Sequence, residues 1–260
     1  MYFVDRFVKV RAIRSTNHTK PHEMSSTIKN EFDRIALATA ASPEGELHNK
    51  HHHNFLLRHL PSNCHNALEV GCGTGDFARR LAQRSDHVLA LDLSPEMIRI
   101  ARECSAQLSN SESSKIEYEV ADVLERPLPK ESFDCIATIA TLHHLSYPEM
   151  LLKMKEALKP GGVLLIVDLF EPAHISDSLP AGARDSFLNL VALPVSAGLR
   201  LIHHGRLLPS REVRDAWAAH EIHDSYPTMN EVRSLCARIL PGAKIKQHLL
   251  WRYSIVWKKA

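Results

Sequence analysis

The sequence between residues 67 and 169 alternates short apolar runs with longer segments that repeat apolar residues at helical spacing. This alternation is typical of βαβ units, in which a helix joins each pair of parallel strands. Because such crossovers are right-handed, successive units build a doubly wound parallel sheet that binds ligands beyond the carboxyl ends of its strands. The five strands expected from the pattern are residues 66–70, 87–93, 115–123, 133–141 and 163–169.

The segments between these strands carry helix signals. Residues 76–83 place Phe77 and Leu81 on one side of a helix. The next helix is expected to begin after Ser94, an N-cap residue that is followed by Pro95 at the first helical position. A third helix, before the fifth strand, is expected to end at a Pro-Gly-Gly sequence.

After the fifth strand the pattern changes. No further strand is evident between residues 169 and 227, where two helical segments predict a cap inserted into the chain. Beyond it, Thr228 and Glu231 have the spacing of a capping box that begins another helix. The strands expected at residues 243–250 and 252–259 are separated by almost nothing, so they should pair antiparallel at one edge of the sheet.

The predicted fold class is therefore α/β, with a doubly wound, seven-stranded and mostly parallel sheet. An antiparallel pair forms one edge, and a helical cap is inserted after the fifth strand. The expected division is an N-terminal arm and helix (residues 1–50), a ligand-binding core (51–170), the helical cap (171–227), and a final helix with the edge strands (228–260).

Composition limits the possible partners and the compartment. The chain has 32 Lys and Arg residues and 30 Asp and Glu residues. A net charge of +2 does not produce the extended positive potential with which proteins bind nucleic acid. The five cysteines include no CxxC pair, which favours free thiols in a reducing cytoplasm. No run approaches the ~20 apolar residues of a transmembrane helix, so we expect a soluble protein without a membrane partner.

The stretch ALEVGCGTGDF, residues 67–77, is a strand followed by a glycine loop and the start of a helix. A dinucleotide-binding GxGxxG loop would have its third glycine at Asp76, whereas Gly75 comes one residue earlier. Asp76 at the helix start and Glu69 at the strand end would both repel a pyrophosphate. The loop therefore favours a ligand without phosphate, and a tight turn without any ligand is the alternative.

The motif LEVGCGTG resembles the first motif of the class I (Rossmann-like) S-adenosylmethionine-dependent methyltransferases, an acidic residue followed by three alternating glycines. S-adenosylmethionine carries an ammonium and a sulfonium but no phosphate, so this resemblance makes carboxylates near the loop favourable. SFDCIATIATLHHL and LKPGGVLLIVD resemble the family's segments around the fourth and fifth strands. The resemblance covers residues 67–168 closely and the terminal strand pair loosely.

The resemblance implies a set of cofactor-binding residues at the strand ends. Asp92 would accept hydrogen bonds from the ribose hydroxyls, and Asp122 would accept one from the adenine amino group while the next backbone unit reads a ring nitrogen. The alternatives are a strand-end or helix-capping role for Asp92 and a turn role for Asp122. The full implied set is Glu69, Gly71, Cys72, Gly73, Gly75, Asp92, Leu93, Asp122, Val123 and Thr138.

Methyl transfer from a sulfonium is an in-line displacement, in which the protein mainly holds the nucleophile in line and excludes water. Where the nucleophile must lose a proton, a histidine is a natural base. His143 and His144 follow the fourth strand, beside the expected position of the sulfonium, and His143 is the catalytic candidate. The alternative is that this histidine packs under the next helix and caps its start.

The expected activity is methyl transfer to an O, N or C atom of a small molecule. ATLHHL lacks the Asn/Asp-Pro-Pro-aromatic sequence with which many nucleic-acid and amino-group methyltransferases clamp a flat substrate. We therefore expect no nucleic-acid substrate, and the sequence indicates no oligomeric state. Two alternatives stay open, namely an aminopropyl transferase with a similar glycine motif and a regulatory protein that binds the cofactor without turnover.

Histidine is abundant, with 17 residues, and several of them lie in HNKHHHNFLLRH, residues 48–59. Three adjacent histidines on a helix point in three directions, and no Cys or carboxylate partner is evident, so no metal site is predicted. In the family that the chain resembles, the helix before the first motif often covers the methionine end of the cofactor. His51, His52 and His53 are therefore expected either to line the active site or to form a solvated surface.

Overall fold

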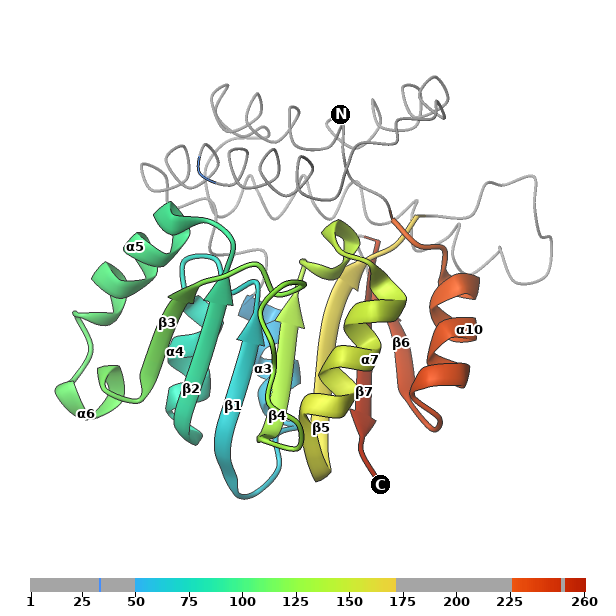
Figure 1. Ribbon diagram of the computed structural model, residues 1–260, viewed down its shortest axis with the longest axis horizontal. Helices are drawn as coiled ribbons and strands as arrows, with labels where there is room; N and C mark the ends of the chain where they lie inside the picture. Colours follow the sequence, from blue (N-terminus) through green and yellow to red (C-terminus); the bar gives the residue numbers. More distant parts are fainter. Residues whose placement is uncertain (1–32, 34–49, 172–225, 249–250) are drawn as a thin grey trace.

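The computed structural model describes residue 33 and residues 50–171, 226–248 and 251–260. Its centre is a seven-stranded sheet with the order β3-β2-β1-β4-β5-β7-β6 (Figure 1). The strands are β1 (Cys64–Val70), β2 (Ser85–Asp92), β3 (Ile116–Val120), β4 (Phe133–Ile139), β5 (Leu158–Leu169), β6 (Lys244–His248) and β7 (Arg252–Lys258). The described helices are α3 (Lys50–Leu57), α4 (Asp76–Ala82), α5 (Pro95–Ser105), α6 (Asn110–Ser113), α7 (Tyr147–Ala157), α10 (Met229–Ile239) and the 3-10 turn η3 (Leu142–His144).

The predicted fold class is confirmed for the sheet. β1 to β5 pair in parallel, while β7 pairs antiparallel with both β5 and β6. The expected helical cap (171–227) and the N-terminal arm (1–50) lie almost entirely outside the described residues. The division of the chain into four parts thus stays a prediction. None of the described helices is long and apolar enough to cross a membrane.

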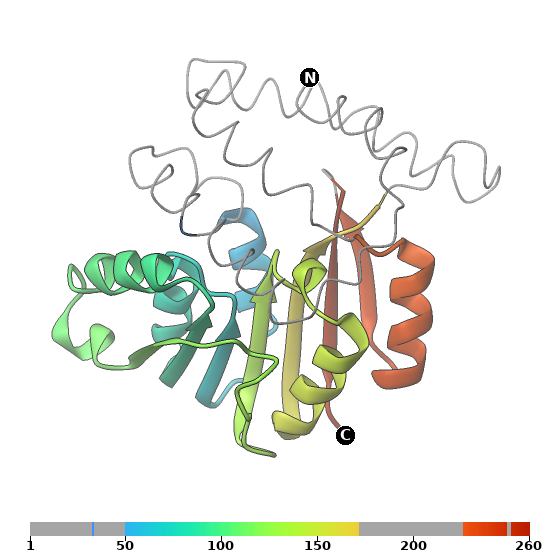
Figure 2. The same ribbon diagram turned by 45° about the horizontal axis from the view of Figure 1, so that its top comes forward.

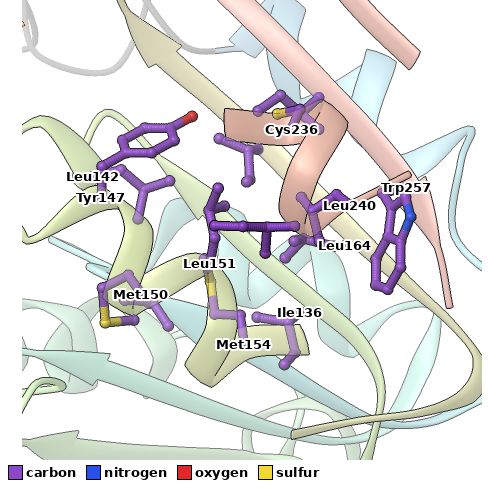
Figure 3. Close-up of a cluster of buried hydrophobic side chains, with 14 of the residues drawn as sticks. Ile136, Leu142, Tyr147, Met150, Leu151, Met154, Leu164, Cys236, Leu240 and Trp257 are labelled. Atoms are coloured by element: carbon purple, nitrogen blue, oxygen red, sulfur yellow. The ribbon is translucent and has the colours of Figure 1, made fainter. Parts of the chain in front are cut away.

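One apolar cluster fills the face of the sheet that α7 and α10 cover, which is the front face in Figure 1. Figure 3 shows Leu151 and Met154 of α7 and Leu240 from the end of α10 packed over Leu164 of β5. These side chains are completely buried. Since burying a large aliphatic side chain contributes about 1.5–3 kcal/mol, this cluster anchors the loops that precede α7 and α10.

A second apolar cluster covers the opposite face, against α3, α4 and α5. The predicted face of the first helix is confirmed, because Phe77, Ala78 and Leu81 of α4 are buried here. Alternate residues of β1, β4 and β5 complete the cluster, as expected for strands that are buried on both faces.

The helix starts follow the predicted signals, but one helix end does not. Ser94 caps α5 by accepting a hydrogen bond from the Met97 N–H, and the Thr228–Glu231 capping box begins α10. By contrast, α7 ends at Ala157, and the Pro-Gly-Gly sequence lies inside β5. The proline disfavours helical backbone at the residue before it, so the chain is already extended when it reaches Gly161.

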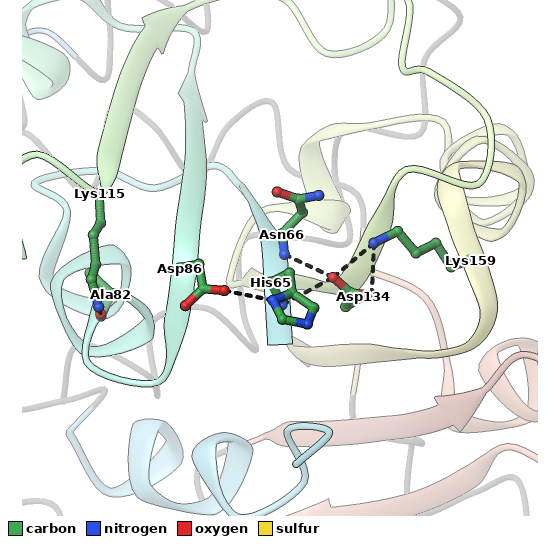
Figure 4. Close-up of polar contacts among 7 residues, drawn as sticks. All are labelled: His65, Asn66, Ala82, Asp86, Lys115, Asp134 and Lys159. Atoms are coloured by element: carbon green, nitrogen blue, oxygen red, sulfur yellow. Dashed lines mark hydrogen bonds and ion pairs between the residues drawn. The ribbon is translucent and has the colours of Figure 1, made fainter. Parts of the chain in front are cut away.

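A polar cluster joins the strand starts at the edge opposite to the carboxyl ends. Asp134 of β4 accepts hydrogen bonds from the backbone N–H groups of His65 and Asn66 and from Lys159 Nζ (Figure 4). Burial alone would raise the pKa of Asp134, but these hydrogen bonds and the lysine charge lower it below its usual range. The ionised carboxylate therefore links β1, β4 and β5.

We predict that Asp134→Asn lowers the free energy of unfolding by about 1 to 3 kcal/mol, as for a lost hydrogen bond to a charged group. A carboxyl whose pKa is lower in the folded state stabilises above its unfolded pKa of ~3.9 and loses this contribution as the pH falls through the folded value. Urea titrations at several pH values should show the difference from the parent protein at pH 7 and its decline in acid.

The matched control is Glu103→Gln, which removes an exposed carboxylate bound to Arg99 and should cost less than ~0.5 kcal/mol. Equal costs for the two variants at pH 7 would contradict the role of Asp134.

Candidate functional site

The glycine loop lies between β1 and α4 at the carboxyl edge of the sheet, which Figure 2 brings forward. Gly71, Gly73 and Gly75 all have positive φ, at 72°, 52° and 76°. A Cβ on Gly71 would lie 2.8 Å from Thr141 Cβ, and one on Gly75 would collide with the Tyr118 ring. A Cβ on Gly73 would meet no atom of the described residues within 4 Å. Two glycines therefore permit close packing, whereas the described residues leave open space beside Gly73.

Glu69 is buried below this loop, with 2% of its surface exposed. Its Oε2 atom has no hydrogen-bond partner among the described residues. Burial raises the pKa of Glu69 well above its usual value, and the nearby charges of Asp76 and Asp92 add to this effect. A cationic group beside Glu69 would oppose this increase in pKa and stabilise the ionised carboxylate, so the site favours a ligand with positive charge.

Asp92, at the end of β2, holds the loop in place. Its two carboxylate oxygens accept hydrogen bonds from the N–H groups of Gly73 at 2.7 Å and Ser94 at 2.9 Å. Burial raises the pKa of Asp92, although these two hydrogen bonds oppose the increase. Cys72 is buried beside it, and its N–H donates to Leu91 O. The carboxylate thus lies between the glycine loop and the start of α5, with Leu93 in the connecting segment.

Asp122 and Val123 follow β3 at the same edge. The Ala121 N–H donates to Asp92 O at 2.9 Å, which brings this segment against the end of β2. Asp122 Oδ1 accepts from the Leu124 N–H at 2.9 Å, so the carboxylate takes part in a turn. The Val123 side chain is buried in the apolar cluster, which leaves its backbone as the polar part of this residue.

Thr138 differs from the other implied cofactor-binding residues. It pairs with Val70 in the sheet and is completely buried, and its Oγ1 has no hydrogen-bond partner among the described residues. Side chains alternate along a strand, so Thr138 faces α7 with Ile136, whereas Glu69 faces α4. The structure brings together the implied residues of β1, β2 and β3 and separates the Thr138 side chain from Glu69.

His143, in the turn η3 after β4, is paired with a carboxylate. Its Nδ1 lies 2.6 Å from Asp168 Oδ1, and its backbone N–H donates to Asp168 Oδ2 at 3.0 Å. Asp168 is completely buried near the end of β5, and Oδ1 also accepts from the Leu169 N–H. The His143 ring stacks against Tyr226 at 4.9 Å between centroids. The histidine is thus held by its backbone, its ring nitrogen and a ring contact.

His52 and His53 of α3 are buried, at 4% and 3% exposed, so the solvated alternative is wrong for these two residues, whereas the side chain of His51 lies outside the described part of the structure. His53 Nδ1 lies 3.3 Å from Asp76 Oδ2 beside the glycine loop, and its ring contacts Phe77. The His52 ring lies edge-on to His248, with centroids 5.4 Å apart. Among the described residues, no group of three His, Cys, Asp or Glu side chains could hold a metal ion.

Two residues of this region were not singled out from the sequence. Asp168 could have been found as an acidic residue that ends an apolar strand at the same edge as the others. Asp33 accepts hydrogen bonds from Ser94 Oγ and from the Glu96 N–H, which places it next to Asp92. No motif surrounds Asp33, and only the folded chain brings it to the start of α5.

Comparisons with known proteins agree with this geometry. Residues 67–162 match a family described as a methyltransferase domain. The chain is 28% identical over 214 residues to an uncharacterized methyltransferase of Mycobacterium tuberculosis, across 81% of this chain and 95% of that protein. It is 32% identical over 151 residues to the ubiquinone biosynthesis O-methyltransferase of Xylella fastidiosa, across 53% and 58% of the two chains.

The fold is similar to that of the N-methyltransferase NodS from Bradyrhizobium japonicum in complex with S-adenosylhomocysteine. The TM-score is 0.56 with 15% identity, across 91% of this chain and 98% of that one. The sheet order and the glycine loop define a Rossmann-like methyltransferase fold. Together with the family match to residues 67–162, they indicate a methyltransferase domain with the fold of the class I S-adenosylmethionine-dependent methyltransferases, a family whose cofactor is S-adenosylmethionine.

The residues at the carboxyl edge fit this cofactor. The buried, unpartnered Oε2 of Glu69 suits an ammonium group, and the carboxylates of Asp76 and Asp92 give the loop a negative charge without a phosphate-binding cradle. The open space beside Gly73 allows a ligand to approach the backbone.

We predict that Gly73→Ala weakens the binding of S-adenosylhomocysteine by about tenfold or more, equivalent to ~1.4 kcal/mol, because the new methyl group enters the open space. Isothermal titration calorimetry measures this change. Gly161→Ala is the matched control, since Gly161 also has positive φ and open surroundings but lies at the start of β5.

Both substitutions put an L-residue in left-handed backbone and should lower the free energy of unfolding by about 1–2 kcal/mol. Cofactor binding should change only in Gly73→Ala. An unchanged affinity in that variant would show that the ligand does not approach Gly73.

Proposed function

We propose that the chain methylates a hydroxyl oxygen of a small molecule and that His143 is the general base. The observation that carries the proposal is the buried pair of His143 and Asp168 beside the glycine loop. Thr141 links the two regions, because it precedes η3 and packs against Gly71.

The hydrogen bonds of Asp168 support one protonation state of His143. Its carboxylate oxygens accept from the backbone N–H groups of His143 and Leu169 as well as facing the imidazole. An ionised carboxylate that accepts every bond requires the proton on His143 Nδ1. Nε2 then has a lone pair and can accept a proton.

S-adenosylmethionine supplies a methyl group that is activated by the sulfonium. When bound, the cofactor would supply this methyl group to the acceptor oxygen and would keep the electron pair of the broken carbon–sulfur bond on its sulfur. The hydroxyl proton passes to His143 Nε2, and Asp168 stabilises the imidazolium. Glu69 would hold the ammonium of the cofactor, Asp92 the ribose hydroxyls and Asp122 the adenine amino group.

Several observations support a small-molecule acceptor. The Xylella fastidiosa relative is named as an O-methyltransferase of ubiquinone biosynthesis, and the whole chain carries a net charge of only +2. All five cysteines are free, which supports a reducing compartment such as the cytoplasm. We therefore include a small-molecule acceptor and a cytoplasmic location in the proposal.

The first experiment supplies methyl-labelled S-adenosylmethionine to the protein with fractions of a metabolite extract. Label on a small acceptor with release of S-adenosylhomocysteine is the expected result. Release of methylthioadenosine would indicate aminopropyl-type transfer instead. Cofactor binding without any transfer would indicate a regulatory protein.

We predict that His143→Ala lowers kcat by about 10²- to 10⁴-fold, the usual contribution of a positioned base. The affinity for S-adenosylhomocysteine should be unchanged. The rise of kcat/KM with pH that reports deprotonation of His143 should disappear in this variant.

Asp168→Asn should also lower kcat, because an amide N–H facing Nδ1 favours the tautomer with the proton on Nε2. His65→Ala is the control, since His65 is exposed at the opposite edge of the sheet. If His143→Ala keeps full turnover at every pH, His143 is not the base.

A further inference from the structure

Arg252 is the first residue of β7 and lies at the carboxyl edge of the sheet. β7 runs antiparallel to β5, so Arg252 pairs with Leu169 at the end of β5 and with His248 at the end of β6. Asp168, which holds the proposed base, directly precedes Leu169. The arginine is therefore close to the reaction site along the chain and across the sheet.

The arginine side chain faces α3. Its neighbour Tyr253 points the other way and bonds through its hydroxyl to Tyr147 of α7, at 2.7 Å. Because side chains alternate, Arg252 shares its face with Ser254, whose hydroxyl lies 2.8 Å from His248 Nε2. The ring of His248 in turn contacts His52 and Phe55 of α3. The side chains on this face of the start of β7 therefore include the guanidinium of Arg252 and the imidazoles of His248 and His52.

The guanidinium is buried, and part of its hydrogen-bonding capacity is unused by the described residues. Arg252 is 9% exposed, and its Nη1 has no hydrogen-bond partner within the described part of the chain. Burial lowers the pKa of Arg252, and attraction to Asp168 opposes the decrease. The Asp168 oxygens are already occupied by His143 and Leu169. A guanidinium stays protonated in proteins, so the unused Nη1–H donors favour a ligand group that accepts hydrogen bonds, and an anionic acceptor most strongly.

The backbone beside Arg252 is a second, independent observation. Trp251 is 3% exposed and has φ of 55°, in the left-handed region that bulky residues rarely adopt. Its carbonyl accepts a hydrogen bond from the Phe170 N–H, which ties this conformation to the end of β5. Strained backbone of this kind is frequent at ligand-binding sites.

We infer that Arg252 binds an anionic group, a carboxylate or a phosphate, on the methyl acceptor. This inference rests on the proposed function, which it extends by naming the class of acceptor. The planar guanidinium can donate two parallel hydrogen bonds to such a group and would fix the acceptor relative to His143. If Arg252 served only to keep Asp168 ionised, its replacement would change turnover but would not affect anion binding.

The first test uses the protein saturated with S-adenosylhomocysteine and titrated with sodium phosphate or sodium benzoate at constant ionic strength. Benzamide serves as the neutral probe. We expect saturable binding of at least one anion by calorimetry, weakened about tenfold or more in Arg252→Met. Stronger binding of phosphate would identify a phosphate group on the acceptor, and stronger binding of benzoate would identify a carboxylate.

Arg252→Gln is the second variant should Arg252→Met fail to fold, and Arg252→Lys should retain part of the binding. Arg99→Met is the control, because Arg99 is an exposed arginine that pairs with Glu96 and Glu103 on α5. Equal anion binding in the parent protein and in the Arg252 variants would overturn the inference, as would binding of neither anion.

The second test separates this inference from the proposed function. A metabolite extract is divided on an anion exchanger, and both fractions are assayed with methyl-labelled cofactor. Labelled product from the retained fraction, with a KM that rises in Arg252→Met, supports the inference. Product only from the unretained fraction overturns the inference and leaves the methyltransferase proposal standing. Absence of product from both fractions contradicts the proposed function and with it the assignment of the anion to a methyl acceptor.

Discussion

The parallel pairing of β1 with both β2 and β4 is the constraint on which the rest of the structure depends. Because the crossovers return each parallel strand in the same direction, the loops that follow the strands meet at one edge of the sheet. At this edge Gly71 packs against Thr141 from the loop after β4, and Gly73 donates to Asp92 at the end of β2. The geometry of the site follows from strand direction and from these contacts between loops.

Charge is distributed unevenly along this edge. Glu69, Asp76 and Asp92 surround the glycine loop, where they raise the pKa of Glu69 and favour a cation. At the start of β7, the buried Arg252 has an Nη1 without a partner among the described residues, and we propose that it binds an anion. A cationic cofactor and an anionic acceptor would each meet opposite charge, with His143 located in the turn after the intervening strand β4.

The pair of His143 and Asp168 has a geometry that fits both a packing role and the proposed role as a base. Leu142 and His143 are buried at the start of the segment that leads into α7, as a packing role requires. The same burial orients the imidazole through Asp168, as a base requires. Asp168 also attracts the charge of Arg252 on the neighbouring strand β7. These polar groups lie at the edge of the apolar cluster under α7.

The sequence by itself determined three features: a mostly parallel sheet with an antiparallel edge pair, the residues at which capped helices begin, and the glycine loop. These depend on local periodicity, on side chains that bond within a few residues, and on backbone angles that only glycine adopts easily. It also made His143 a candidate base, because a histidine that directly follows an apolar strand can be recognised from the sequence. Only the tertiary structure decided the partners. Contacts between residues far apart in the chain place Asp168, Asp33 and Arg252 at the carboxyl edge of the sheet. The packing of α3 buries His52 and His53. Burial and long-range pairing depend on how whole elements pack, and no local pattern records them.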